Sequence, residues 1–176
     1  MKFLNDIRLL LLGLWLGASV FFIAVAQVAF MVLPQRESAG AVVGGTLSIL
    51  NFAGIGIAVL VLLMSLVTAR GTNVALAWVD RVLMILLGAA CAVGQFVIGL
   101  MIASVRSQMD GKPIDEFATD DPLRIQFNQL HEYSVWVLTA AMIAGLIAFF
   151  VIANRRTATA KPASTDPYNF EKEFKI

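Results

Sequence analysis

The chain has 176 residues, of which 59% are apolar and 14% are charged, and its mean hydropathy is +0.83. Soluble domains average about 45–50% apolar and about 25% charged residues, so this composition indicates an integral membrane protein. The net charge of +1 excludes the strongly basic surface that binds nucleic acid.

Four uncharged apolar runs follow one another along the chain, and a helix needs about 20 such residues to cross a bilayer. The expected spans cover about residues 9–33, 46–68, 82–105 and 133–154. The first run follows Lys2 and Arg8 and contains Ala24-Val25-Ala26, which a signal peptide and its cleavage site would also show. Because its apolar stretch continues to Leu33, which is long for a signal core, we expect this span to be retained.

The fourth span is predicted to be part of a longer helix. Asp121 is a good N-cap, and Pro122 suits the first helical position. The pattern then runs without Gly or Pro to Gly145, which gives a rod of roughly 45–50 Å against a hydrocarbon core of ~30 Å. The fold class predicted from these spans is an all-α integral membrane four-helix bundle with an extended, outward-projecting fourth helix.

Residues 107–132 form the only long connection between spans. Its second half is amphipathic, because Leu123, Phe127 and Leu130 share one helical face at i, i+4, i+7 spacing. This lead is expected either to pack on the bundle or to lie against lipid headgroups. With it, residues 1–156 make up the expected transmembrane bundle.

Lysine and arginine are distributed asymmetrically about the spans, which predicts the orientation. If the N-terminus is cytoplasmic, the cytoplasmic segments carry Lys2, Arg8, Arg70, Arg81, Arg155, Arg156 and Lys161. The opposite side then carries Arg36, Arg106, Lys112 and Arg124. Both termini are therefore expected in the cytoplasm, and a bacterial inner membrane is the expected location.

The last segment, residues 157–176, is predicted to be a cytoplasmic tail that opens as a Ser/Thr/Ala/Pro linker. Four large apolar side chains stand among charges near its end: Tyr168, Phe170, Phe174 and Ile176. They suit a docking peptide for a partner chain or the membrane surface, and an idle tail is the alternative.

Small residues four apart favour close helix packing in a bilayer, where lipid tails remove the hydrophobic drive for association. The expected packing residues are Gly13, Gly17, Ala90, Gly94, Ala141 and Gly145. No charged residue falls inside the four expected spans. Proton relays, ion pathways and voltage sensors need charged residues within the membrane, so these functions are not indicated. Phosphate loops, H-E-x-x-H pairs and G-x-S-x-G turns are also missing from the sequence. We therefore expect no enzymatic activity, no cofactor and no metal site, and Cys91 has no second cysteine to pair with.

Polar side chains within or beside the spans lean toward the leaflet opposite the termini, when each span is centred in the bilayer. The predicted cluster comprises Gln27, Asn51, Gln95, His131, Ser134 and Thr139. One interpretation is hydrogen bonding between helices, at about 0.6 kcal/mol per bond. The other is a polar pocket around His131, the only histidine, that is open to a ligand, a metal or a headgroup.

Several motifs resemble one known family. They are the run from Leu12 to Phe22, then Ala29-Phe30, Leu33-Pro34, Ala39-Gly40, and the stretch Phe127 to Ser134 that leads into the last span. Together they resemble the transmembrane protein 205-like family of small four-helix membrane proteins. The resemblance implies four spans and no mechanism, because that family is a domain of unknown function.

Two functions remain open on the sequence alone. The first is a non-enzymatic accessory or structural subunit that packs against lipid and against other membrane-protein chains of a larger complex. The alternative is a small transporter or metal-handling protein in which His131 and methionine side chains form a soft site; such ligands suit Cu(I). Copurifying chains would favour the first function, and bound copper would favour the second.

Overall fold

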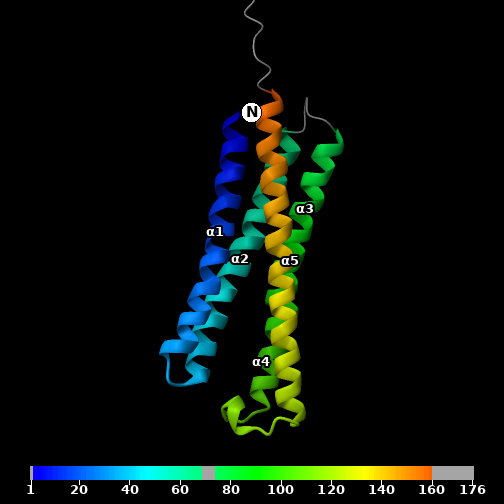
Figure 1. Ribbon diagram of the computed structural model, residues 1–176. Coiled ribbons are helices and arrows are strands. Elements are labelled where there is room, and N and C mark those ends of the chain that lie inside the picture. The colour runs from blue at the N-terminus through cyan, green and yellow to red at the C-terminus, as the bar shows by residue number, and fades with distance from the viewer. Residues whose placement is uncertain (1, 69–73, 160–176) are drawn as a thin grey trace, which may run out of the picture.

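The computed structural model describes residues 2–68 and 74–159 of the chain. Within them, four long helical spans are each long and apolar enough to cross a membrane, and they form a four-helix bundle (Figure 1). The spans are α1 (Lys2–Val32), α2 (Arg36–Thr68), a third composed of α3 (Val74–Ala92), the π-helix η1 (Val93–Ile98) and α4 (Gly99–Ser107), and α5 (Pro122–Thr159). The protein is a multi-pass integral membrane protein.

The helices form a ring in which α1 and α3 each pack against both α2 and α5. Helices α1 and α3 therefore face each other across the diagonal of the bundle. The start of α1 and the end of α5 lie at the same end of the bundle (Figure 1). The opposite end, called the loop end here, holds the α1–α2 link at residues 33–35 and the connection at residues 108–121.

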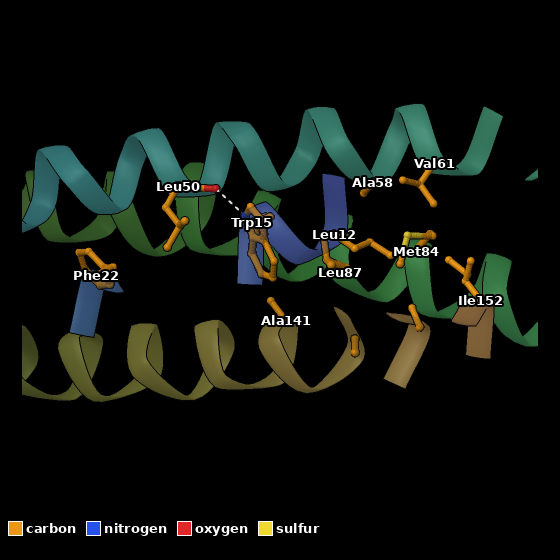
Figure 2. Close-up of a cluster of buried hydrophobic side chains, with 13 residues drawn as sticks. Leu12, Trp15, Phe22, Leu50, Ala58, Val61, Met84, Leu87, Ala141 and Ile152 are labelled. Carbon is orange, nitrogen blue, oxygen red and sulfur yellow. Dashed lines mark hydrogen bonds between the residues drawn. The ribbon is translucent and has the colours of Figure 1, made fainter. Parts of the chain in front are cut away.

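Buried residues recur at spacings of three and four along much of each span. In α1 they include Arg8, Leu12, Trp15, Ser19 and Phe22; in α3 they are Ala77, Asp80, Met84, Leu87 and Cys91. This heptad spacing is the sequence pattern of helices packed side by side at about +20°. The resulting core is apolar and continuous through the four spans, with Trp15, Leu87 and Ala141 near its middle (Figure 2).

Helix α5 begins as the sequence predicts. The backbone N–H of Leu123 donates to Asp121 Oδ1 at 2.8 Å, so Asp121 caps the helix and Pro122 is its first residue. With 38 residues, the helix is roughly 57 Å long. Its amphipathic lead packs on the bundle: Leu130 is buried with Ile98, Val105 and Met109, and Leu123 and Phe127 pack against this cluster.

Three spans begin before their apolar cores. Helix α1 begins at Lys2 rather than near residue 9. Helix α2 begins at Arg36 rather than near residue 46, and α3 begins at Val74 rather than near residue 82. Packing of buried residues in these added turns, such as Ala39 and Asp80, stabilises helix beyond the purely apolar stretch. Charges expected outside the spans consequently lie within helices, which corrects the expectation of uncharged spans.

The exposed tryptophan and tyrosine side chains of the described residues lie toward both ends of the bundle, as expected where amphipathic rings meet lipid headgroups. Trp78 is exposed in the second turn of α3, with Arg81 over its ring at 5.8 Å. Tyr133 and Trp136 are exposed on α5 toward the loop end. Between these levels the surface is covered by large apolar side chains, which suits contact with lipid tails.

Candidate functional site

A buried ion pair joins α1 to α3 at the end of the bundle that holds the start of α1. An Nη2 N–H of Arg8 donates to Asp80 Oδ2, and the two side chains are 1% and 0% exposed. The hydroxyl of Ser65 in α2 donates to the same carboxylate oxygen at 3.0 Å. Arg8 also donates from Nη1 to Asn5 Oδ1 at 3.2 Å. This ion-pair cluster therefore ties three helices together.

The position of the cluster explains how a charge pair is tolerated. Arg8 and Asp80 are five and six residues inside the ends of their spans, at Phe3 and Val74, or roughly 8–9 Å along the helix. The pair thus lies near the edge of the hydrocarbon core, where the cost of burying charge is lower than at the bilayer centre. Each charge is neutralised by the other, although Arg8 Nε is buried and has no hydrogen-bond partner among residues 2–68 and 74–159.

The sequence pattern indicates this pair, although the hydropathy of each span taken separately does not. Asp80 falls in the heptad series Ala77, Asp80, Met84, and Arg8 precedes Leu12 and Trp15 at the same spacing. A charged residue on the apolar stripe of a helix points into the bundle. Two opposite charges on the stripes of two helices, at the same end, therefore predict a buried pair.

A second polar layer lies between α2 and η1. The hydroxyl of Ser48 donates to Gln95 Oε1 at 2.9 Å. One turn away, the side-chain amide of the buried Asn51 lies against Gly94, 3.2 Å from where a Cβ would stand. Nearby, Trp15 donates from Nε1 to the Leu50 carbonyl at 3.1 Å. The polar groups of α2 at this depth are thus used in contacts with α1 and η1.

The structure separates the six residues of the predicted polar cluster. Asn51 and Gln95 both lie at the α2–η1 contact, where Asn51 lies against Gly94 and Gln95 bonds to Ser48. Ser134 is half-buried on α5. Gln27, His131 and Thr139 are exposed, and Thr139 donates to the Val135 carbonyl of its own helix at 2.8 Å. In residues 2–68 and 74–159, no hydrogen bond joins His131 to another member of the cluster. Ligand binding at His131 stays a prediction.

Most of the predicted packing residues lie at helix contacts. A Cβ at Gly13 would stand 3.6 Å from the Phe149 ring, and one at Gly145 would stand 3.0 Å from Leu87. Ala141 is buried and Ala90 is half-buried against the core. Gly17 is exposed with no neighbour within 4 Å.

Two further glycines at helix contacts were not predicted. A Cβ at Gly54 would stand 2.5 Å from Cys91 Sγ and 2.9 Å from Trp15 Nε1. A Cβ at Gly88 would stand 3.1 Å from the Ala58 Cβ. Each glycine has an alanine four positions on, Ala58 and Ala92, so the small-residue spacing could have identified both.

The proposed docking residues Tyr168, Phe170, Phe174 and Ile176 lie outside the described residues. Within the described ranges, no three His, Cys, Asp or Glu side chains are grouped so that they could hold a metal ion.

Comparison with known proteins identifies one family. Residues 10–110 match the family model DUF4149, a domain of unknown function. No curated protein matches the chain, and no solved structure does. The matched region covers more than half of the chain and runs from α1 to the end of the third span.

Proposed function

Because the chain belongs to the DUF4149 family, a domain of unknown function, we propose its role from the surface that its fold presents. The protein is a non-enzymatic accessory subunit that packs laterally against another membrane-protein chain and against lipid. The observation that carries this proposal is an apolar groove of about 350 Å³ between α1 and α2.

The groove has the shape that helix docking in a bilayer requires. Its floor is formed by the buried Trp15, Phe22 and Leu50, and its rims by side chains such as Phe21 and Ile49, which are 68% and 72% exposed. Ala18 and Ala53 also line it. Helices approach closely in membranes where small residues leave room for the partner's backbone or side chains.

The polar interior supports the same proposal. Arg8, Asp80 and Ser65 bond to one another, and Ser48 bonds to Gln95. Because these polar groups bond to one another inside the bundle, they are not available to an external partner. A partner chain would instead meet the apolar surface along the sides of the helices.

Orientation and family relationship belong to the proposal as well. Both termini are proposed to be cytoplasmic in a bacterial inner membrane, which the lysine and arginine distribution supports. A relationship to the transmembrane protein 205-like family is supported by the motifs between Leu12 and Gly40, all of which fall in the matched region 10–110. The stretch Phe127 to Ser134 lies beyond that region.

Site-specific photo-crosslinking tests the groove. A photoreactive phenylalanine analogue at Phe21, on the groove rim, is expected to give one discrete crosslinked protein in native membranes. The matched control is Phe150 on α5, which is 56% exposed and does not line the groove; it is expected to give lipid adducts alone. Filling the groove with Ala53→Leu should abolish the Phe21 product. Lipid adducts alone at Phe21, or the same protein product at both positions, would contradict the proposal.

A further inference from the structure

The loop end of the bundle holds a cation whose position differs from that of Arg8. Arg106 lies in the last turn of α4, one residue before the end of its span, and is half-buried. Its guanidinium carbon lies 5.6 Å from the centre of the Phe127 ring of α5. Its Nη2 lies 2.8 Å from where a Cβ of Gly40 in α2 would stand. The guanidinium is therefore held between α2 and α5.

No carboxylate neutralises Arg106 within residues 2–68 and 74–159. The nearby ion pair at this end joins Arg36 to Asp115 at 3.5 Å, between side chains that are 73% and 47% exposed. Glu37 lies on the Gly40 side of α2, but it is exposed and forms no ion pair within the described chain. The planar donors of Arg106 are thus available to an anion, and a guanidinium binds phosphate through paired hydrogen bonds.

The depth of Arg106 indicates which anion would reach it. Arg106 is level with Gly40, in the second turn of α2, so it lies near the end of the transmembrane region. Phospholipid phosphates occupy this level of a bilayer, just beyond the hydrocarbon core. Glycine at position 40 leaves the space that the guanidinium fills.

The surface on the membrane side of Arg106 suits an acyl chain. Helix α4 packs on α5, and the α1–α2 hairpin diverges from α4 and α5 toward the loop end (Figure 1). On α2, Gly44 and Gly45 are exposed with no atom within 4 Å of a Cβ position. On the third span, Ile102 lies one turn before Arg106 on the same face of the helix and is half-buried. Gly44 likewise lies one turn after Gly40 on the same face of α2, so the space between α2 and α4, called the α2–α4 seam here, has Gly44 and Ile102 on the membrane side of Arg106.

We infer that Arg106 binds the phosphate of a phospholipid in the leaflet at the loop end, with an acyl chain along the α2–α4 seam. The inference deepens the lipid-contact part of the proposed function and rests on it. It is independent of the partner groove, which lies on the α1 side of α2. Phe127 and Gly40 are positioning residues, because they hold the guanidinium and do not contact the phosphate.

Lipid binding to the full chain in detergent, measured by native mass spectrometry, tests the inference. The probes are dimyristoyl phosphatidylglycerol, dimyristoylglycerol, which lacks the phosphate, and inorganic phosphate. The wild-type chain is expected to retain one phosphatidylglycerol and to bind the other two weakly. Arg106→Gln should weaken phosphatidylglycerol binding about ten- to hundredfold, the loss expected for hydrogen bonds to a charged group.

Arg36→Gln is the matched control, because it removes an exposed arginine at the same end and should leave binding unchanged. Phe127→Leu keeps the charge, removes the ring that holds it, and should weaken binding by a smaller factor; it tests the site even if Arg106→Gln fails to fold. The inference would be overturned if Arg106→Gln or Phe127→Leu left phosphatidylglycerol binding unchanged, or if Arg36→Gln weakened it as much as Arg106→Gln does. It would also be overturned if dimyristoylglycerol or inorganic phosphate bound the wild-type chain as tightly as phosphatidylglycerol. The Phe21 crosslink should persist in Arg106→Gln, which separates this result from the partner proposal.

Discussion

Glycine positions show how closely the helices approach one another. Gly54 and Gly56 are two residues apart in α2, yet only Gly54 faces the core: Trp15 Nε1 and Cys91 Sγ lie within 3 Å of its Cβ position, whereas nothing lies within 4 Å of that of Gly56. The contact of α1, α2 and α3 at this depth therefore depends on the missing side chain of Gly54.

Gly54→Ala is expected to destabilise the bundle by about 1–3 kcal/mol, because Trp15 and Cys91 must shift to admit a methyl group. The matched control Gly56→Ala is expected to be neutral or slightly stabilising, since alanine favours helix over glycine. The measurement is the free energy of unfolding in mixed detergent micelles. Equal effects of the two substitutions would show that α2 does not pack as described.

Polar residues on the heptad positions have a different role from polar residues elsewhere on the same helices. Arg8, Asp80 and Asn51 occupy such positions and are buried. Gln27 and Thr139 do not, and they are exposed. For a side chain in a span, rotation about the helix axis decides whether it meets another helix or lipid.

At the scale of the elements, the Arg8–Asp80 pair is a link across the diagonal of the bundle. Helices α1 and α3 otherwise make contact chiefly through α2 and α5. A buried pair of this kind favours one register of the two helices, because any shift along the axis leaves both charges uncompensated.

Removing one partner of the pair is expected to cost about 3–5 kcal/mol, because the remaining charge is left buried. Arg8→Met or Asp80→Leu alone should therefore destabilise strongly, whereas the double substitution should recover most of the loss. A double-mutant cycle on unfolding free energies measures this coupling. If the single effects simply added in the double variant, the two side chains would not interact in the membrane.

The π-helix η1 interrupts the third span where it meets the polar residues of α2. The backbone N–H of Gly99 bonds to the Gly94 carbonyl, five residues back. The same segment carries Gln95, which accepts from Ser48. Such single turns within α-helices often accompany functional sites, and here the turn lies at the helix contact of the Ser48–Gln95 layer.

At the scale of the whole molecule, the two ends of the bundle differ in how their charges are arranged. One end holds the neutral Arg8–Asp80 pair among three helices. The loop end holds Arg106 without a carboxylate among the described residues, and the projecting start of α5. The start of α1 and the end of α5 share the first of these ends (Figure 1), so one experiment can report the orientation of both.

A reporter that is active only in the cytoplasm is expected to work when fused after Ile176 and to fail when inserted at the exposed Gly111. The reason is the excess of lysine and arginine near the spans at the terminal side. A reporter that is active only outside the cytoplasm serves as the control and should give the reverse pattern. Activity of the cytoplasmic reporter at Gly111 alone would place both termini outside.

The sequence by itself determined the four-helix class and the start of α5. The free energy of inserting a helix into lipid is approximately a sum over its residues, so it can be read from the sequence. The capping of α5 by Asp121 involves only residues next to each other in the chain, so it can be read from the sequence as well. Motif spacing also pointed to Gly145 and Ala141, which lie in the core.

Only the tertiary structure decided where α2 and α3 begin and which polar residues meet. Ser48 meets Gln95 and Asn51 lies against Gly94, whereas His131 remains exposed. The Arg8–Asp80 pair was missed because hydropathy sums residues along one helix, while burial of a charge depends on the rotation and register of two. Those quantities are set by packing between helices that are distant in sequence.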